Sequence, residues 1–213
     1  YQSPPLIFIL MFISLLLPGL VQADWHKEEQ AIMGTAVSIE LWHDNKLQAN
    51  KCISLVMANM HRIDDAMSPY KPDSELSRLN QMAAAKPFKT SKELFQLVEA
   101  ANRISEMTKG RFDITFASAG HLYDYRKAVR PSEEKLKGTI EAINYQHIQL
   151  DRKKRTIRFL HPGVKIDLGG IAKGHAVDQA IHILTRCGIK QALVSAGGDS
   201  RILGDKQGLP WMT

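Results

Sequence analysis

The chain has 213 residues, of which 44% are apolar and 23% charged, and it carries a formal net charge of +6. These fractions are those of an ordinary globular protein, and they exclude a low-complexity chain. The length allows one large domain or two small ones. The positive charge gives only a weak attraction to acidic ligands, anionic lipid or nucleic acid, and solubility explains it most simply.

The first 23 residues have the pattern of a secretory signal peptide. Residues 6–17 are nearly all apolar, but the run is too short to span a bilayer comfortably. Val21-Gln22-Ala23 then forms a small-residue cleavage pattern. We therefore expect an exported, periplasmic protein cut after Ala23, with a membrane anchor as the alternative. Because Asp24 rather than a cysteine follows, a lipid-anchored form is not expected, although association with the inner membrane stays open.

Cys52 and Cys187 are the two cysteines of the chain. Export would place them in an oxidising compartment, where disulfides persist. Both fall on helical patterns, so free buried thiols are an equally good interpretation. The sequence contains no cluster of cysteine and histidine with the spacing of a metal site.

The first half of the mature chain is predicted to contain, in chain order, a strand over residues 30–42, a helix over 47–67, a short helix over 74–79 and a helix from Thr90 to near Gly110. The strand prediction rests on alternating apolar residues, and the long helix on apolar residues at helical spacing. The long helix should end before Pro69, because the residue before a proline leaves the α region. Ser74 is expected as an N-cap, and Thr90 with Glu93 forms a capping box.

The second half is predicted to contain a helix over 133–143, a hairpin of 148–150 with 156–160, a strand over 165–168, a helix to about Arg186, and strands over 192–195 and 199–203. The basic run over residues 152–155 is most simply a solvated hairpin tip. It lacks the interleaved aromatic residues of single-strand binders, so no nucleic-acid partner is expected. Because βα units and hairpins are mixed, the expected fold class is α/β or α+β, with a mixed sheet and packed helices.

Residues 165–174 form the most informative segment, because a strand there is expected to end at Asp167, turn through Gly169-Gly170 and enter a helix. A helix N-terminus presents unpaired N–H groups and a partial positive charge. Glycines allow close approach of a ligand, and Lys173 adds a full charge. Together these features favour a phosphate site, with an ordinary tight turn as the alternative. The spacing fits neither a P-loop nor a Rossmann fingerprint.

Five short motifs follow one another along the chain: Met33-Gly34-Thr35; Ser68-Pro69-Tyr70 with Ser74-Glu75-Leu76 and Asn80; residues 110–115; residues 167–174 with Asp178; and residues 195–199. Singly, each has an ordinary structural interpretation. Tyr70 could sit in a surface turn, Met33 or Phe112 in the core, Asp113 at a helix cap, and Lys173 on an exposed helix face. In this order, however, the chain from about Met33 to Trp211 resembles the FAD:protein FMN transferase family (ApbE).

The resemblance implies an ApbE-like flavin transferase fold and a magnesium-dependent enzyme of the bacterial cell envelope. Such an enzyme takes FAD and transfers FMN to a threonine or serine hydroxyl of an acceptor flavoprotein, such as a subunit of a membrane redox complex. A phosphoester forms and AMP leaves. The FAD-binding positions carried over by the resemblance are Met33, Tyr70, Lys71, Pro72, Arg111, Phe112, Asp113, Asp167 and Lys173.

The resemblance also implies that the Gly170 carbonyl is a ligand of Mg²⁺, while the catalytic residue stays unknown. Two other functions remain open on the same motifs. One is hydrolysis of FAD to FMN and AMP, with water in place of the hydroxyl. The other is non-catalytic flavin binding in the periplasm.

The sequence departs from the family pattern in two places. Residues 117–120 stand where the family usually carries a proline. The chain also ends at Thr213, whereas the family continues into a segment that completes the magnesium site, and it begins at Tyr1 without Met. We therefore expect residues 1–23 to be the signal peptide and residues 24–213 to be the N-terminal majority of an incomplete, C-terminally truncated transferase domain.

Overall fold

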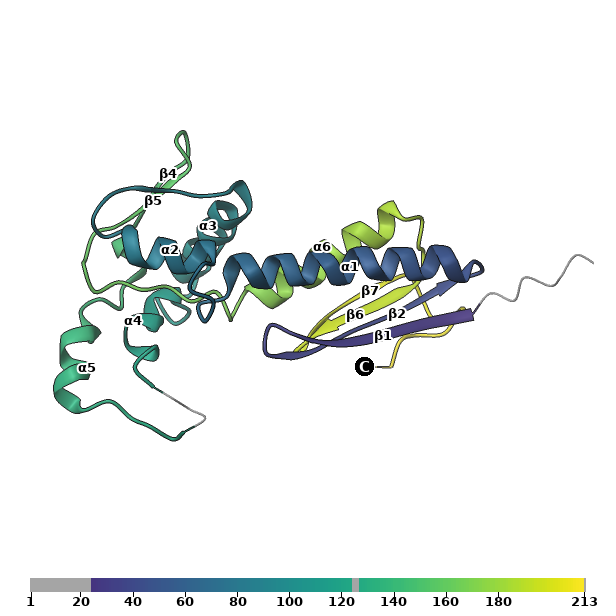
Figure 1. The fold of residues 1–213 in the computed structure, drawn as a ribbon, viewed down its shortest axis with the longest axis horizontal. Helices are drawn as coiled ribbons and strands as arrows, with labels where there is room; N and C mark the ends of the chain where they lie inside the picture. The colour runs from purple at the N-terminus through teal and green to yellow at the C-terminus, as the bar shows by residue number, and fades with distance from the viewer. Residues whose placement is uncertain (1–23, 124–126, 213) are drawn as a thin grey trace, which may run out of the picture.

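The computed structural model describes residues 24–123 and 127–212. The molecule is elongated, with a four-stranded sheet and two long helices at one end and a lobe of shorter helices with a three-stranded sheet at the other (Figure 1). The predicted signal peptide, residues 1–23, lies outside the described residues. Among the described helices, none combines the length and the apolar character needed to cross a bilayer.

The larger sheet has the order β1-β2-β6-β7, and all its neighbouring strands are antiparallel. Its strands are β1 (Asp24–Ile32), β2 (Thr35–His43), β6 (Ala192–Ala196) and β7 (Asp199–Leu203). Helices α1 (Lys46–Met67) and α6 (Ala172–Arg186) pack against each other and against this sheet. In β2 the alternate side chains Val37, Ile39 and Leu41 are fully buried, which is the pattern expected of a sheet covered on one face.

The smaller lobe carries a three-stranded antiparallel sheet in the order β3-β5-β4. Its elements are α2 (Glu75–Met82), β3 (Phe88–Lys89), α3 (Lys92–Met107), a 3₁₀ turn η2 (Ile114–Phe116), α4 (Ala117–Gly120), α5 (Glu133–Ile140), a 3₁₀ turn η3 (Tyr145–His147), β4 (Ile148–Asp151) and β5 (Thr156–Phe159). The predicted hairpin is confirmed as β4 and β5, with residues 152–155 exposed at its tip.

The α/β (α+β) class is confirmed, but the expected mixed sheet is wrong for the described residues, because both sheets are antiparallel. The strand expected over residues 30–42 is confirmed where the apolar residues alternate, as β2, but residues 30–34 do not begin it. The structure has a hairpin there, in which Met33 and Gly34 form the turn with φ of 56° and 71°. Strand β1 is an edge strand with mostly polar residues, so it carries no apolar alternation that a sequence pattern could detect.

Residues 165–168 are extended but form no strand, which corrects the predicted strand over these positions. The Asn80 side chain instead forms two hydrogen bonds with the backbone of Ile166. Its Oδ1 accepts from the Ile166 N–H, and its Nδ2 donates to the Ile166 carbonyl, each at 2.9 Å. Further along, the Asp167 N–H donates to the carbonyl of Ile114 at 3.0 Å. A side-chain amide thus takes the place of a neighbouring strand.

The capping box predicted at Thr90 is displaced by one residue. Ser91 is the N-cap of α3, and its Oγ accepts from the Leu94 N–H at 3.2 Å. Thr90 instead donates through its hydroxyl to the carbonyl of Arg155 on the hairpin. Glu93 does not fold back on the helix start, because its carboxylate is paired with other helices.

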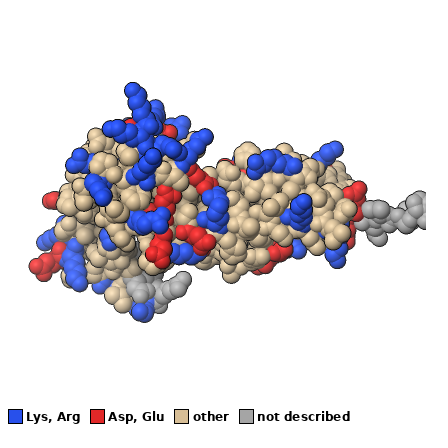
Figure 2. Space-filling view, turned by 45° about the horizontal axis from the view of Figure 1, so that its top comes forward, with Lys and Arg blue, Asp and Glu red and all other residues tan. Residues whose placement is uncertain are grey.

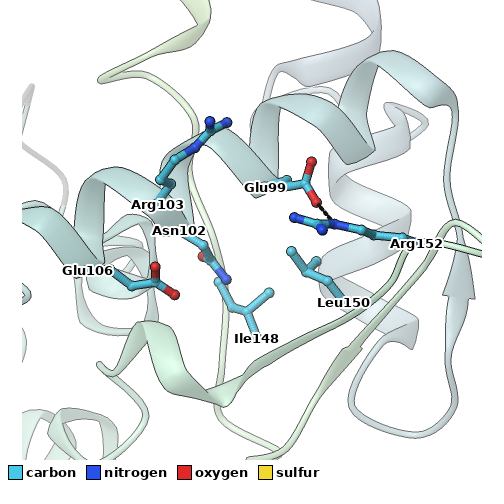
Figure 3. Close-up of a pocket in the computed structure, with 7 residues that line it drawn as sticks. All are labelled: Glu99, Asn102, Arg103, Glu106, Ile148, Leu150 and Arg152. Carbon is cyan, nitrogen blue, oxygen red and sulfur yellow. Dashed lines mark hydrogen bonds and ion pairs between the residues drawn. The ribbon is translucent and has the colours of Figure 1, made fainter.

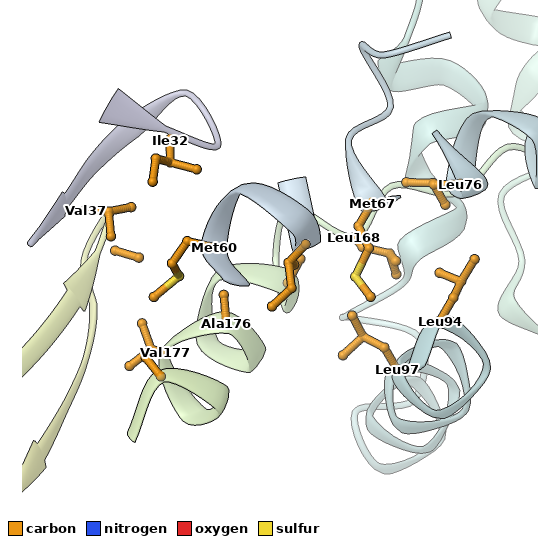
Figure 4. Packing of buried hydrophobic residues seen from close by; sticks show 14 of the residues in the cluster. Ile32, Val37, Met60, Met67, Leu76, Leu94, Leu97, Leu168, Ala176 and Val177 are labelled. Carbon is orange, nitrogen blue, oxygen red and sulfur yellow. The ribbon is translucent and has the colours of Figure 1, made fainter. Parts of the chain in front are cut away.

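One hydrophobic cluster runs through both ends of the molecule. Leu168 and Met67 lie between Ala176 of α6 and Leu97 of α3, so the segment before α6 joins the two parts of the core (Figure 4). Both cysteines are free. Burial and the neighbouring thiol of Cys187 raise the pKa of the Cys52 thiol to about 12, so Cys52 behaves as a core residue.

The three tryptophans gather at the end of the molecule where the described chain begins. The ring centroids of Trp25 and Trp42 are 5.3 Å apart, and those of Trp25 and Trp211 are 5.2 Å apart. The ammonium of Lys206 lies 5.1 and 5.2 Å from the Trp25 and Trp211 rings, and it pairs with Glu40 at 2.7 Å. This cluster attaches residues 206–211 to the start of β1.

We expect Asn80→Ala to lower the free energy of unfolding by about 2–4 kcal/mol, because it leaves a buried N–H and a buried carbonyl of Ile166 without partners. Chemical denaturation measures this. Asn50→Ala is the matched control, since Asn50 is exposed on α1 and should change the stability by less than about 0.5 kcal/mol. Equal stability of the two variants would contradict the proposed role of Asn80.

Candidate functional site

The turn before α6 is closed by its own side chains. Asp167 Oδ1 accepts from the Gly169 N–H at 2.6 Å, and Lys173 Nζ donates to the Gly169 carbonyl at 2.8 Å. The turn is therefore held between a carboxylate on one side and an ammonium on the other. An ammonium has three N–H donors, so Lys173 keeps two of them for a ligand.

Residues of three other motifs meet next to this turn. A Cβ placed on Gly170 would lie 3.2 Å from Cε2 of Phe112, so the Phe112 ring rests against the turn. A Cβ on Gly197 would lie 2.8 Å from Thr35 Oγ1 and 3.1 Å from Lys173 Cδ. Residues 33–35, residues 197–199 and the start of α6 therefore meet around Lys173.

Helix α6 begins without a side-chain cap. Helices α1, α2, α3 and α5 are each capped by a side chain, from Asn45, Ser74, Ser91 and Ser132. A helix start without such a cap, next to two exposed glycines and a lysine, is suited to an anion. Asp199 lies beside the same helix start, because its Cγ would be 4.0 Å from a Cβ on Gly174.

Asp113 is a cap in the structure. Its Oδ1 accepts from the N–H and the hydroxyl of Thr115, at 2.8 and 2.6 Å. Its Oδ2 accepts from the Tyr145 N–H at 2.9 Å. Because both carboxylate oxygens already accept hydrogen bonds from the protein, Asp113 shapes the loop that carries Phe112.

The remaining candidate residues form no hydrogen bond or ion pair with the turn within residues 24–123 and 127–212. Tyr70 is 90% exposed, and Pro72 and Arg111 are also exposed. Lys71 Nζ is bound by Asp64 at 2.5 Å and Asp65 at 2.6 Å, and these hydrogen bonds raise the pKa of Lys71 above its usual range. Met33 packs partly against the core.

Glu93 forms a link that sequence reasoning missed. Its carboxylate binds Arg62 of α1 at 2.6 Å and His175 of α6 at 2.9 Å. Three helices are thereby joined one turn beyond the anion-binding segment. In the sequence, only the position of His175 directly after Gly174 pointed to this link. Spacing alone cannot show which carboxylate would pair with His175.

A magnesium site was implied through the Gly170 carbonyl. Within the part of the chain that the structure describes, no three His, Cys, Asp or Glu side chains are grouped so as to hold a metal ion. The exposed carbonyl of Gly170 is a suitable hard ligand, but these residues do not form a complete coordination shell.

The cavities of the smaller lobe are separate from this turn. One of about 640 Å³ lies between α3 and β4 and is lined by Glu99, Asn102, Arg103, Glu106, Ile148, Leu150 and Arg152 (Figure 3). None of these residues belongs to the motifs that meet around Lys173. We therefore place the candidate site at the open turn before α6.

We expect Gly197→Ala to lower the free energy of unfolding by about 2 kcal/mol, because alanine is disfavoured at positive φ and the added methyl meets Thr35. The φ of Gly197 is 56°. Thermal or chemical unfolding measures the loss. Gly138→Ala is the control, since nothing lies within 4 Å of its added Cβ in α5, and it should stabilise the protein slightly.

Glu93 gives the stability a defined pH dependence. The hydrogen bond from Arg62, followed by that from His175, lowers the pKa of Glu93 from its usual 4.5. Its contribution is therefore fully present above pH 4.5 and is lost as the pH falls through the lower folded-state pKa.

The difference in unfolding free energy between the wild type and Glu93→Gln should thus shrink on acidification below about pH 4.5. Denaturation curves across that range measure it. Glu29→Gln, on an exposed position of β1, should show no such trend. A difference that stays constant with pH would rule out the ion pairs of Glu93 as its source.

Comparison with known proteins confirms the resemblance seen in the motifs. The model of the ApbE family matches residues 33–213. The FAD:protein FMN transferases of Vibrio cholerae and Haemophilus influenzae are each 30% identical to the chain, over 84% of it and 55% of their own lengths. The chain thus spans about half the length of the curated relatives it matches.

Solved structures agree with the fold. The flavin transferase ApbE from Vibrio cholerae superposes with a TM-score of 0.81 at 28% identity, over 89% of this chain and 63% of that one. The ApbE protein from Thermotoga maritima superposes with a TM-score of 0.79 at 29% identity, over 87% and 60%. From its motifs, its fold and its family match, this chain belongs to the ApbE family.

Proposed function

We propose that this chain binds FAD at the turn before α6 and serves the transfer of FMN to a threonine or serine hydroxyl of an acceptor flavoprotein. The observation that carries the proposal is the convergence of four motifs at this turn: Gly169-Gly170 with Lys173, the loop of Phe112, and Gly197 against Thr35. The names of the relatives, FAD:protein FMN transferase, support the same reaction.

The reaction forms a bond between the acceptor oxygen and the phosphorus of the FMN half, and it breaks the diphosphate bridge so that AMP leaves. Negative charge builds on the non-bridging oxygens and on the leaving phosphate. The two remaining donors of Lys173 and the N–H groups at the start of α6 would stabilise this charge. Phe112, held by the Asp113 cap, offers an aromatic face to a flavin or adenine ring.

Asp167 has a structural role within this proposal. Its carboxylate forms the turn by accepting from the Gly169 N–H, next to the exposed Gly170. The carbonyl of Gly170 would be one ligand of Mg²⁺. The group that removes the proton from the acceptor hydroxyl is not among the residues described above.

Tyr70, Lys71 and Arg111 belong to the proposal as outer contacts. Their assignment rests on the resemblance, and each is exposed or ion-paired at the surface. The acceptor would be a flavoprotein of the cell envelope, in keeping with the signal-peptide pattern of residues 1–23. Export to the periplasm is likewise a proposal that rests on this pattern alone.

We expect Lys173→Gln to weaken FAD binding at least about tenfold, because it removes a charge-assisted hydrogen bond to phosphate. Isothermal titration calorimetry with FAD measures this affinity. Lys165→Gln is the matched control, since Lys165 is exposed in the same segment and should bind FAD as the wild type does. Asp167→Asn removes the negative charge of the turn but keeps its hydrogen bond, because an asparagine oxygen can still accept from the Gly169 N–H. This variant therefore distinguishes the effect of the charge from that of the turn geometry.

The reaction itself is tested by mass spectrometry of a threonine-containing acceptor peptide incubated with the chain, FAD and Mg²⁺. A covalent gain of FMN by the peptide supports transfer. Release of AMP without peptide modification would indicate hydrolysis, and intact FAD would indicate binding alone. Equal FAD affinity of the wild type and Lys173→Gln would remove the assignment of the site to this turn.

A further inference from the structure

The positive charge of the chain is concentrated on one surface. Strands β3 and β5 and the loops beside them carry seven basic side chains, which we call the basic sheet surface: Lys86, Lys89, Arg152, Lys153, Lys154, Arg155 and Arg158. The same stretches, residues 86–89 and 148–159, contain one carboxylate, Asp151. Their net charge of +6 equals that of the entire chain, so the rest of the molecule is neutral on balance.

All seven basic side chains are exposed. Figure 2 shows the blue side chains projecting together from the smaller lobe, and Figure 1 shows that the β4–β5 hairpin stands out from it. Within the described parts of the chain, only two of the seven form ion pairs. Arg152 pairs with Glu99 at 2.5 Å (Figure 3), and Lys154 pairs with Asp151 at 3.9 Å. The remaining charges are available to a partner outside the chain.

Charged and polar residues predominate in the lining of the hollow at the centre of this surface. A shallow cavity of about 690 Å³ lies along the hairpin, and Pro87 and Leu150 are its only apolar lining residues. Stable protein–protein interfaces have a centre that is depleted of charge and rich in aromatic residues. The basic sheet surface has the opposite composition, which favours a partner that offers many anionic groups without a fixed shape.

We propose that the basic sheet surface docks the protein on a bilayer that contains anionic phospholipid. Clusters of four to eight lysines and arginines attract such a surface, with a contribution of about 1 kcal/mol per side chain near it. Lysine and arginine side chains on a protruding hairpin can adapt to mobile headgroups. This inference does not rest on the proposed flavin transfer, because no residue of the basic sheet surface belongs to the turn before α6.

A nucleic acid fits the surface less well. Binders of single strands combine basic residues with aromatic faces on which bases stack. Phe88, between Lys86 and Lys89, is half-buried against the core. Within residues 86–89 and 148–159, the basic side chains have no exposed aromatic neighbour. Competition by duplex DNA distinguishes the two kinds of partner.

The test is co-sedimentation of the full chain with vesicles of phosphatidylcholine alone and with an equal mixture of phosphatidylcholine and phosphatidylglycerol. The apolar residues 6–17 would act on both kinds of vesicle, so the difference between them isolates the effect of charge. We expect the wild type to bind the mixed vesicles more tightly and to lose that preference as salt is raised. Removing both charges in Lys153→Gln with Lys154→Gln should weaken this binding about 25-fold, or about fivefold per side chain.

The matched control is Lys27→Gln with Lys46→Gln, which removes the same charge from exposed lysines of β1 and α1 at the other end of the molecule. It should bind the mixed vesicles within about twofold of the wild type, as expected for charges far from the contact. An equal loss in both double variants would overturn the proposal, because net charge alone would then explain binding. Equal binding to the two kinds of vesicle, or a preference for duplex DNA over the mixed vesicles, would overturn it as well.

Discussion

The hydrogen bonds between the Asn80 side chain and the backbone of Ile166 are the interaction on which the rest of the site depends. They fix an extended segment that has no strand beside it. Since Leu168 follows at once and is fully buried between the two parts of the core, the direction of the chain into the Gly169-Gly170 turn is set at this point. A polar side chain from α2 thereby determines where α6 starts and where Lys173 lies.

The Glu93 ion pairs act on the same region from the other side. Arg62, Glu93 and His175 join α1, α3 and α6 within a single turn of the open helix start. Asn80 therefore holds the segment before the turn, and Glu93 holds the helix after it. The glycines between them can remain free of side chains, because the positioning is done by their neighbours.

Sequence periodicity predicted the long helices, the β4–β5 hairpin and β6, because each has buried or half-buried residues at regular spacing. A strand was also expected at β7, although its residues are mostly exposed. It could not predict β1, whose nine residues are mostly polar at a sheet edge. It also mistook residues 165–168 for a strand, because four residues that alternate in burial look the same whether another strand or Asn80 satisfies their backbone. A side-chain partner 86 positions away in the chain leaves no periodic signal.

The candidate site was predictable as a set of motifs, and only the structure separates their roles. Gly197 and Thr35 were visible as parts of motifs, but their contact with Lys173 depends on how β2 pairs with β6. Asp113, by contrast, belongs to a motif, but both of its carboxylate oxygens accept hydrogen bonds from backbone N–H groups. Residue identity alone cannot distinguish a carboxylate that faces a ligand from one that is fully engaged by backbone N–H groups.

The clustering of the three tryptophans has a spectroscopic consequence. Because Trp25 packs against both Trp42 and Trp211 at one end of the larger sheet, the tryptophan emission of the protein comes from a single local environment. It will report detachment of residues 206–211 from β1 and melting of that sheet, whereas the smaller lobe contains no tryptophan. A flavin at the α6 turn would therefore be detected in this emission through energy transfer over a distance, and not through contact with an indole ring.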